Sequence, residues 1–304
     1  MNLVKIAAAA YPLDWFDDWK GYEAKLGSWV GEAAGNGANL LVFPEYGAME
    51  LASLGGAAVA GDIQDALHEA SRHKERSETL HARLAAQHGV HILAASGPVF
   101  GLPHADGRPV NRASLFGPDG LIGHQDKAMM TRWERDGWNV VPGDGLQVFD
   151  TPLGRIGILI CYDSEFPLLG RALAEAGVEI LLVPSATEAL AGFTRVRVGA
   201  MARALENQLI AVHAPVVGTA PWCYGMEENT GSASVYGPPD HGFPPDGIIA
   251  EGALGQPGWV YGEVSRDAIA AVRADGGVLN LRHWPEQEPQ LAKVALIPRD
   301  REIS

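Results

Sequence analysis

Gly154-Arg-Ile-Gly-Ile-Leu-Ile-Cys161-Tyr-Asp-Ser-Glu-Phe-Pro167 is the stretch that decides the fold. Its first part is a short run of isoleucine, leucine and glycine bounded by turn residues, which is typical of a buried strand. The polar residues Asp163–Glu165 supply N-cap and first-turn chemistry, and Leu168–Ala176 has a helical pattern. Cys161 is therefore predicted to lie where a buried strand ends and a helix begins.

This position predicts a reactive thiol. At such a junction backbone N–H groups point outward and the helix dipole favours an anion, so we expect the pKa of the Cys161 thiol to be lowered. The thiolate is the nucleophilic form of cysteine. A buried cysteine of the core is the alternative interpretation, and residues elsewhere in the chain must decide between the two.

The composition is that of an ordinary globular protein of 304 residues, long enough for one large domain or two small ones. Its net charge of −14 argues against binding to nucleic acid or to anionic membranes. No apolar run is long enough to span a bilayer, and the short one at the N-terminus predicts a first strand rather than a signal peptide. Cys161 and Cys223 could pair, but a nucleophilic Cys161 must be free, so we expect a reducing, cytoplasmic location.

Strands and helices alternate along the chain, and no linker divides it. The alternation predicts a single α/β domain in which helices cover strands too apolar to face water. We place this domain at residues 1–284. A polar tail with one apolar patch at Val294–Ile297 follows at 285–304, either disordered or laid on a partner subunit.

The pattern predicts helices at Trp19–Ala34, Asp62–Gln87, Arg171–Ala176 and Phe193–Glu206. It predicts strands at Val4–Ala10, Asn39–Phe43, His91–Ser96, Arg112–Phe116, Leu121–Gln125, Gln147–Asp150, Arg155–Ile160, Glu179–Val183, Leu209–His213, Ala233–Tyr236, Gly247–Ala250 and Trp259–Val264.

Three residues with reactive side chains lie within two positions of the end of a predicted strand: Glu45, Lys127 and Cys161. Taken singly, a glutamate in such a place is usually a cap or a solvated loop residue, and a lysine is usually on the surface. The strand ends of one sheet system can converge on one pocket, where the three side chains would serve a single chemistry.

Around these residues the sequence resembles the carbon–nitrogen hydrolase (nitrilase) superfamily, and its amidase-like branch in particular. The resemblance rests on Phe43-Pro44-Glu45, on the isolated Lys127, and on Ile160-Cys161-Tyr-Asp163 followed by Phe166-Pro167. The similarity runs from the first strand to about Arg273. It implies an α-β-β-α sandwich, a hydrolase that needs no cofactor, and a homodimer or higher homo-oligomer.

The resemblance also implies a mechanism through an acyl-enzyme. Cys161 attacks the carbonyl carbon of a small-molecule substrate, while Glu45 takes the thiol proton and passes it to the leaving amine. Burial raises the pKa of a carboxylate toward neutrality, which suits this shuttle. Lys127 is a fixed cation beside the developing oxyanion, together with the backbone N–H of Tyr162.

Three further residues are candidates for contact with the substrate. Glu134 matches a second glutamate that the family places beside the substrate, with a salt bridge to Arg132 or Arg135 as the alternative. Glu165 stands close to where branches acting on carboxylate-bearing substrates place an arginine, so we expect a neutral or amine-bearing substrate. The alternative is that Glu165 only stabilises the start of the following helix. Ser185, at the end of the further family mark Val183-Pro184-Ser185, is the third candidate.

The reaction is left open among three hypotheses. Hydrolysis of an amide or N-carbamoyl group comes first, because Tyr162-Asp163 after the cysteine resembles the amidase branches. A nitrilase comes second, because Glu134-Arg135 and Trp138 resemble the nitrilase pattern after the lysine. A catalytically silent scaffold comes third, and the presence of all three reactive residues argues against it. The histidines show no zinc-binding spacing, and serine-hydrolase and Walker A motifs are absent.

Overall fold

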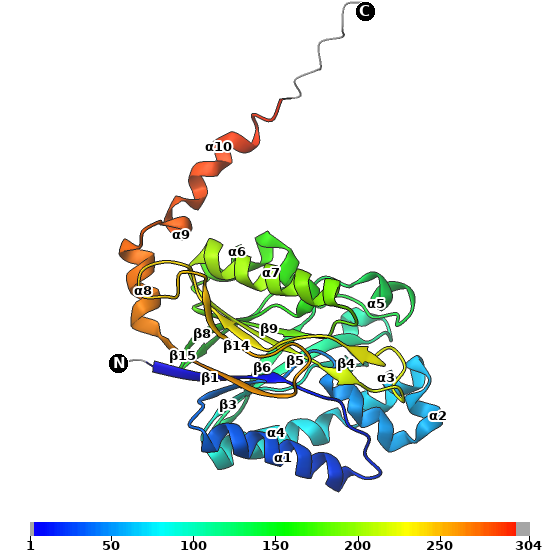
Figure 1. Cartoon of the computed structure of the whole chain (residues 1–304). Helices are drawn as coiled ribbons and strands as arrows, with labels where there is room; N and C mark the ends of the chain where they lie inside the picture. Colours follow the sequence, from blue (N-terminus) through cyan, green and yellow to red (C-terminus); the bar gives the residue numbers. More distant parts are fainter. Residues whose placement is uncertain (1–2, 296–304) are drawn as a thin grey trace, which may run out of the picture.

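Two β-sheets packed face to face form the centre of the molecule, and helices cover the outer face of each sheet (Figure 1). The computed structural model describes residues 3–295. One outer layer contains α1 (Trp19–Gly35) and α4 (Lys74–His88), and the other contains α6 (Pro167–Glu175) and α7 (Leu190–Asn207). This is the α-β-β-α sandwich that the sequence predicts.

The first sheet has seven strands among the described residues, in the order β15-β1-β2-β3-β5-β4, with β6 paired to β5. Strands β1, β2 and β3 are parallel, and β5 and β6 form the predicted antiparallel hairpin. The strands are β1 (Leu3–Ala10), β2 (Leu40–Val42), β3 (His91–Leu93), β4 (Gly97–Val99), β5 (Val110–Gly117), β6 (Gly120–Asp126) and β15 (Gly258–Ser265).

The second sheet has six strands in the described part of the chain, in the order β14-β13-β10-β9-β8-β7. Its centre, β8, β9 and β10, is parallel. The strands are β7 (Val148–Thr151), β8 (Gly154–Ile158), β9 (Ile180–Ser185), β10 (Ile210–Pro215), β13 (Ser234–Tyr236) and β14 (Ile248–Glu251). A separate short pair consists of β11 (Gly218–Thr219) and β12 (Glu228–Asn229).

Strand β1 shows why these sheets are buried on both faces. Ile6 and Ala8 belong to the core that the first sheet shares with β8, β9 and β10 of the second. Ala7 and Ala9, which alternate with them, belong to the core shared with α1 and α4. Because successive side chains of a strand point to opposite faces, a continuous apolar run fills both cores at once.

The other helices depart from the predictions in two places. The helix predicted at Asp62–Gln87 is two helices, α3 (Ile63–Arg72) and α4, separated by His73, which ends one and precedes the other. Helix α8 (Arg266–Asp275) was not predicted, although the Ser265 hydroxyl caps it by accepting from Ala268 N. The remaining short elements are α2 (Ala57–Ala60), α5 (Arg132–Asp136), α9 (Asn280–His283), α10 (Glu288–Leu291) and the 3-10 turns η1 (Gly47–Gly55), η2 (Pro103–Ala105), η3 (Cys161–Glu165) and η4 (Trp284–Gln287).

The C-terminal part of the chain leaves the sandwich. Figure 1 shows α10 extending away from the body of the molecule. The alternative of a wholly disordered tail is wrong for the described residues 285–295, because they include helical turns. The predicted apolar patch at Val294–Ile297 lies partly outside the described residues. No helix between residues 3 and 295 is long and apolar enough to cross a membrane.

Candidate active site

The three reactive residues predicted from the sequence meet at one end of the sandwich. Glu45 follows β2 and Lys127 follows β6 in the first sheet, whereas Cys161 follows β8 in the second. Backbone hydrogen bonds extend each strand almost to the reactive residue, from Phe43 N to Leu93 O and from Leu159 N to Leu182 O. The site therefore lies between the two sheets, and their packing sets its geometry.

Lys127 connects the buried charges of the site. Its Nζ lies 2.7 Å from Glu45 Oε1 and 2.7 Å from Glu134 Oε2. All three side chains are almost completely buried, with exposed fractions of 1%, 1% and 3% for Lys127, Glu45 and Glu134. One ammonium thus compensates two carboxylates that are almost completely removed from solvent, where a charge without a partner would be costly.

Glu45 is held by donors from three parts of the chain. Its Oε1 accepts from Lys127 Nζ and, at 3.0 Å, from Asn111 Nδ2 on β5. Its Oε2 accepts from the backbone N–H of Ala186 at 2.9 Å, just after β9. The carboxylate is therefore fixed in position before any substrate binds.

Glu134 is fixed by a capping box at the start of α5. The Thr131 hydroxyl accepts from Glu134 N, and Glu134 Oε2 accepts from Thr131 N at 2.8 Å. The other oxygen, Oε1, accepts from the Tyr46 hydroxyl at 2.9 Å. Neither Arg132 nor any other arginine in the described residues takes the place of Lys127, so the alternative salt bridge for Glu134 is wrong.

The environment moves the pKa values of the two carboxyls in opposite directions. Burial, reinforced by the negative charge of Glu134, raises the pKa of Glu45. Burial would do the same to Glu134, but the Lys127 ammonium and the Thr131 donors hold the pKa of Glu134 below its ordinary value. Burial would lower the pKa of Lys127, yet Glu134 and Glu45 hold that pKa well above the ordinary value. Lys127 and Glu134 are thus a permanent ion pair, and Glu45 is the group suited to proton transfer.

Cys161 lies on a tight turn rather than at the start of an α-helix. Its φ is +51°, in the left-handed region, and η3 is a 3-10 turn, whereas α6 begins only at Pro167. The predicted lowering of the thiol pKa is wrong. Burial and the negative charge of Glu45 raise the pKa of Cys161 well above its ordinary value, and Lys127 opposes them only partly. The resting form is therefore the thiol, with its Sγ 3.8 Å from the carbonyl oxygen of Ala186.

Asp163 ties the loop after Lys127 to the turn that contains Cys161. Its carboxylate accepts from Ala128 N at 3.2 Å, from Met129 N at 2.7 Å and from Ile160 N at 3.0 Å. Burial raises the pKa of Asp163 to about 7, although Lys127 and these N–H groups pull it down. The carboxyl thus joins the two sheets at the site without facing the substrate cavity.

A cavity of about 770 Å³ opens above the thiol. Glu45, Lys127, Glu134 and Cys161 lie at its floor, and loops of both sheets, α5 and the first turns of α7 form its walls. This volume accommodates a small organic molecule.

Residues 5–274 match the model of the carbon–nitrogen hydrolase family. The chain belongs to the carbon–nitrogen hydrolase family. It is 31% identical over 279 residues to a probable hydrolase, YhcX, of Bacillus subtilis (strain 168), covering 92% of this chain and 53% of that protein. It is 33% identical over 161 residues to a deaminated glutathione amidase of Yersinia enterocolitica, covering 50% of this chain and 56% of that one.

Solved structures of the nitrilase superfamily share the fold of this carbon–nitrogen hydrolase. Nit3 of Saccharomyces cerevisiae, a member of branch 10 of that superfamily, superimposes with a TM-score of 0.70 at 20% identity, over 90% of this chain and 93% of that chain. The chain spans about half the length of the two curated relatives named above. The predicted family and fold are therefore confirmed.

Of the other predicted site residues, two line the cavity and one does not. Tyr162 and Glu165 line the cavity, and Glu165 Oε1 lies 3.4 Å from Arg195 Nε in an ion pair. Ser185 does not line it. The Ser185 side chain is fully buried at the end of β9, with its hydroxyl 2.8 Å from His213 Nε2, so a contact with substrate there is wrong.

Asn111, Tyr46 and the Ala186 backbone are parts of the site that the sequence analysis missed. Asn111 and Ala186 reach Glu45 from far along the chain, and no local pattern signals such a contact. The role of Thr131 could have been predicted, because Thr131-Arg-Trp-Glu134 is a capping-box sequence that indicates a helix start and a fixed Glu134.

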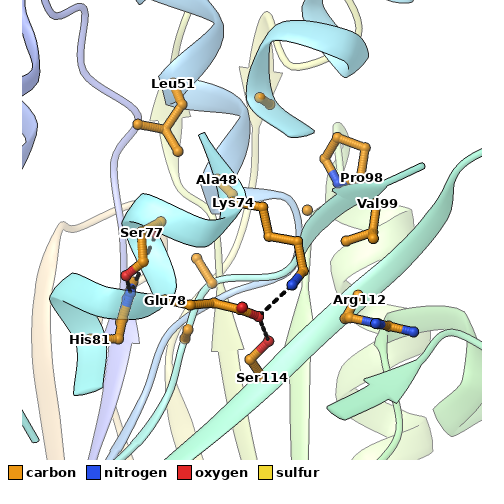
Figure 2. A pocket seen from close by; sticks show the side chains of 14 residues that line it. Ala48, Leu51, Lys74, Ser77, Glu78, His81, Pro98, Val99, Arg112 and Ser114 are labelled. Atoms are coloured by element: carbon orange, nitrogen blue, oxygen red, sulfur yellow. Dashed lines mark hydrogen bonds and ion pairs between the residues drawn. The ribbon is translucent and has the colours of Figure 1, made fainter. Parts of the chain in front are cut away.

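A second, much smaller cavity lies between α4 and the first sheet (Figure 2). Its volume of about 40 Å³ suffices for a water molecule or two. The charges around it compensate one another, since Lys74 Nζ lies 2.8 Å from Glu78 Oε1, which also accepts from the Ser114 hydroxyl. This cavity is part of the helix–sheet packing and offers no place for a substrate.

Neither a disulfide nor a metal cluster occurs in the described residues. Cys161 and Cys223 are both free, and no group of three His, Cys, Asp or Glu side chains between residues 3 and 295 is placed to hold a metal ion. Cys223 is buried beside Met49, and burial raises its pKa to about 12, so it is a core residue.

Proposed function

We propose that this carbon–nitrogen hydrolase cleaves the C–N bond of a small carboxamide or N-carbamoyl compound and releases ammonia through a thioester on Cys161. The observation that carries the proposal is the buried arrangement at the cavity floor. A neutral thiol lies beside a carboxyl of raised pKa, and that carboxyl is in turn held by a lysine with a permanent charge. A proton acceptor and a fixed cation next to a nucleophile are what acyl transfer requires.

The first half of the reaction forms the thioester. Cys161 Sγ bonds to the carbonyl carbon as its proton moves to Glu45, and the carbonyl oxygen takes up the negative charge. The Lys127 ammonium and the Tyr162 backbone N–H stabilise that oxyanion. When the C–N bond breaks, Glu45 gives its proton to the leaving nitrogen, and ammonia departs.

The second half restores the enzyme. Water attacks the thioester carbon and gives a proton to Glu45, the C–S bond breaks, and Glu45 returns the proton to the thiolate. A carboxamide yields a carboxylic acid, and a carbamoyl compound yields a carbamic acid that decomposes to an amine and carbon dioxide. Glu134 keeps Lys127 charged and in place throughout, because its own pKa is held low.

Curated relatives of both kinds match about half of this chain, a deaminated glutathione amidase and Nitrilase 3 of Arabidopsis thaliana among them, so the choice between amide and nitrile rests on the site itself. The Tyr162-Asp163 pair after the nucleophile favours an amide, because it resembles the amidase branches. The Asp163 carboxylate also accepts backbone hydrogen bonds from the loop after Lys127, so this residue helps to hold the site in shape.

The test is ammonia release from matched primary amides, N-carbamoyl amines and nitriles, with product acid and amide followed for each. We expect amides or carbamoyl compounds to be turned over, and the Cys161→Ala variant to lose at least about 10³-fold in kcat with an unchanged fold. Cys223→Ala is the matched control and should stay active. Acid formation from nitriles alone would assign a nitrilase instead, and no turnover by the wild type across the panel would favour a silent scaffold.

A further inference from the structure

The opening of the cavity carries negative charge that the proposed reaction does not use. Glu188, Glu227 and Glu228 line the cavity, and Glu188 and Glu228 are exposed, whereas the charges of the floor are buried. In the described residues none of these three carboxylates forms a salt bridge with a lysine, arginine or histidine. The cations of the lining are Lys127, already shared by Glu45 and Glu134, and Arg195, already paired with Glu165.

The two segments that bear these carboxylates are fastened together. Thr230 N donates to Thr187 O at 2.7 Å, and the Thr187 hydroxyl donates to Thr230 O at 2.8 Å. The Thr230 hydroxyl donates to Glu188 O at 2.9 Å. Glu188 and Glu228 therefore emerge from neighbouring chain segments that hydrogen bonds hold together.

A buried polar group on the same wall also faces the cavity. Asn229 lines it and is only 8% exposed; its Nδ2 donates to Met226 O at 2.8 Å, and its Oδ1 has no donor in the described part of the chain. This oxygen is accessible from the cavity, so it is free to accept a hydrogen bond from a bound ligand. An ammonium supplies one.

Aromatic rings complete the opening. Trp133 on α5 and Tyr224 both line the cavity and are exposed, with exposed fractions of 73% and 53%. Gly225 has no room for a side chain, because the Trp138 ring packs against it, so the loop is held close to α5. Aromatic faces among carboxylates attract organic cations.

We propose that this opening is a subsite for an ammonium group, so that the substrate has an amide or carbamoyl group at one end and a protonated amine at the other. The inference rests on the proposed function and names the substrate class of the same site. Glu165, the residue that the sequence suggested for this preference, is neutralised by Arg195. The selectivity belongs instead to Glu188, Glu227 and Glu228, with Asn229 accepting a hydrogen bond from the ammonium.

The experiment compares three matched amides: aminohexanamide, its uncharged isostere heptanamide, and the monoamide of adipic acid, with shorter and longer chains of each series. For the wild type we expect kcat/KM to favour the cationic amide by at least about tenfold and to disfavour the anionic one, the preference shrinking as salt rises. Glu188→Gln and Glu228→Gln should each lower kcat/KM for the cationic amide about two- to fivefold, and the double variant roughly tenfold, with heptanamide unchanged.

Glu263→Gln, an exposed change of the same charge on β15 and away from the cavity, is the control and should alter none of the three. If heptanamide is hydrolysed as well as aminohexanamide, or if the double variant keeps the preference, the subsite is refuted while the amidase stands. If neither amides nor N-carbamoyl amines are hydrolysed, the proposed function fails. Calorimetry on Cys161→Ala still decides the subsite in that case, because binding of aminohexanamide no tighter than heptanamide refutes it.

Discussion

At the scale of single residues, the site is organised by one ammonium shared between two carboxylates. Lys127 lies 2.7 Å from an oxygen of each, and all three groups are almost completely buried. Removing one member of such a buried set leaves an uncompensated charge, which costs far more than the pair contributes. The split of the two carboxyl pKa values follows from this geometry and separates Glu45, the proton carrier of the proposed reaction, from Glu134, whose pKa is held low.

The Glu45→Gln variant should separate catalysis from thiol acidity. The negative charge of Glu45 helps to raise the pKa of Cys161, whereas Lys127 lowers it. Removing the charge while Lys127 stays should therefore lower the thiol pKa, so that alkylation of Cys161 at a fixed pH becomes faster. At the same time kcat should fall by at least about 10²-fold, because the proton shuttle is lost. The pH dependence of iodoacetamide labelling and of turnover measures both.

Glu165→Gln is the control for this experiment, since Glu165 lines the same cavity but pairs with Arg195. It should leave the labelling rate and kcat close to those of the wild type. A Glu45→Gln enzyme with a raised or unchanged thiol pKa would contradict the charge arrangement described here.

Most of the reactive residues were predictable from the sequence, but their supports were not. Glu45 and Cys161 stand in short motifs that resemble those of the family, and the isolated Lys127 and Glu134 match the family by their order and spacing. Asn111 and Ala186 are 66 and 141 residues away from Glu45 along the chain, and only the packing of two sheets brings them there. The direction of the Cys161 pKa was mispredicted because burial raises this pKa most, and the Glu45 carboxylate that reinforces burial belongs to the other sheet.

At the scale of elements, Asp163 holds the site together across the two sheets. It accepts N–H groups from the residues after Lys127 and from Ile160 before the nucleophile. In Asp163→Asn one of the two oxygens becomes a donor facing an N–H group. We expect kcat to fall about 10- to 10²-fold with KM little changed, because Lys127 and the thiol lose their relative position. Steady-state kinetics with a thermal melt measures this.

Asp150→Asn on β7, an exposed carboxylate, is the matched control and should change neither kcat nor the melting temperature by much. A large loss of melting temperature with kcat intact would make Asp163 a residue of stability alone. Leaving a buried N–H without an acceptor costs about 1–3 kcal/mol, so some destabilisation is expected in any case.

Element prediction succeeded where the pattern is long and local. The β5–β6 hairpin follows from its turn, and α1 and α7 follow from helical spacing. The break at His73 was missed because the helical pattern continues through it. Helix α8 and the start of α5 were missed although both have capping residues, Ser265 and Thr131, that predict a helix start.

At the scale of the whole molecule, the packing of the two sheets brings together site residues that lie far apart in the sequence. Glu45 and Lys127 come from the first sheet, and Cys161 from the second. Glu45 and Cys161, the proton acceptor and the nucleophile of the proposed reaction, thus meet from different sheets. Changes of volume in that core are expected to act on catalysis as well as on stability, since close-packed interiors transmit strain.

The C-terminal tail is the part of the molecule that the sandwich does not bury. Within the described residues, 291–295 are all exposed, and the side chains of Leu291 and Val294 are 69% and 90% exposed. Figure 1 shows the segment directed away from the body. Apolar side chains on an extended arm are typical of a contact with another chain, so we propose that the tail lies on a second copy in a homo-oligomer.

Truncation after Gln287 tests this proposal. Because the segment 288–295 contributes little to the core of its own sandwich, the truncated chain should keep its melting transition and its kcat. The number of subunits per particle, obtained from its mass in solution, should fall below that of the full-length oligomer. A full-length variant with Leu291→Lys and Val294→Lys is the matched control for tail length and should dissociate in the same way if apolar burial drives the contact. Size-exclusion chromatography with light scattering gives the masses. The same number of subunits in all three proteins would show that the tail does not assemble the molecule, and a loss of kcat on truncation would show that it reaches a neighbouring cavity.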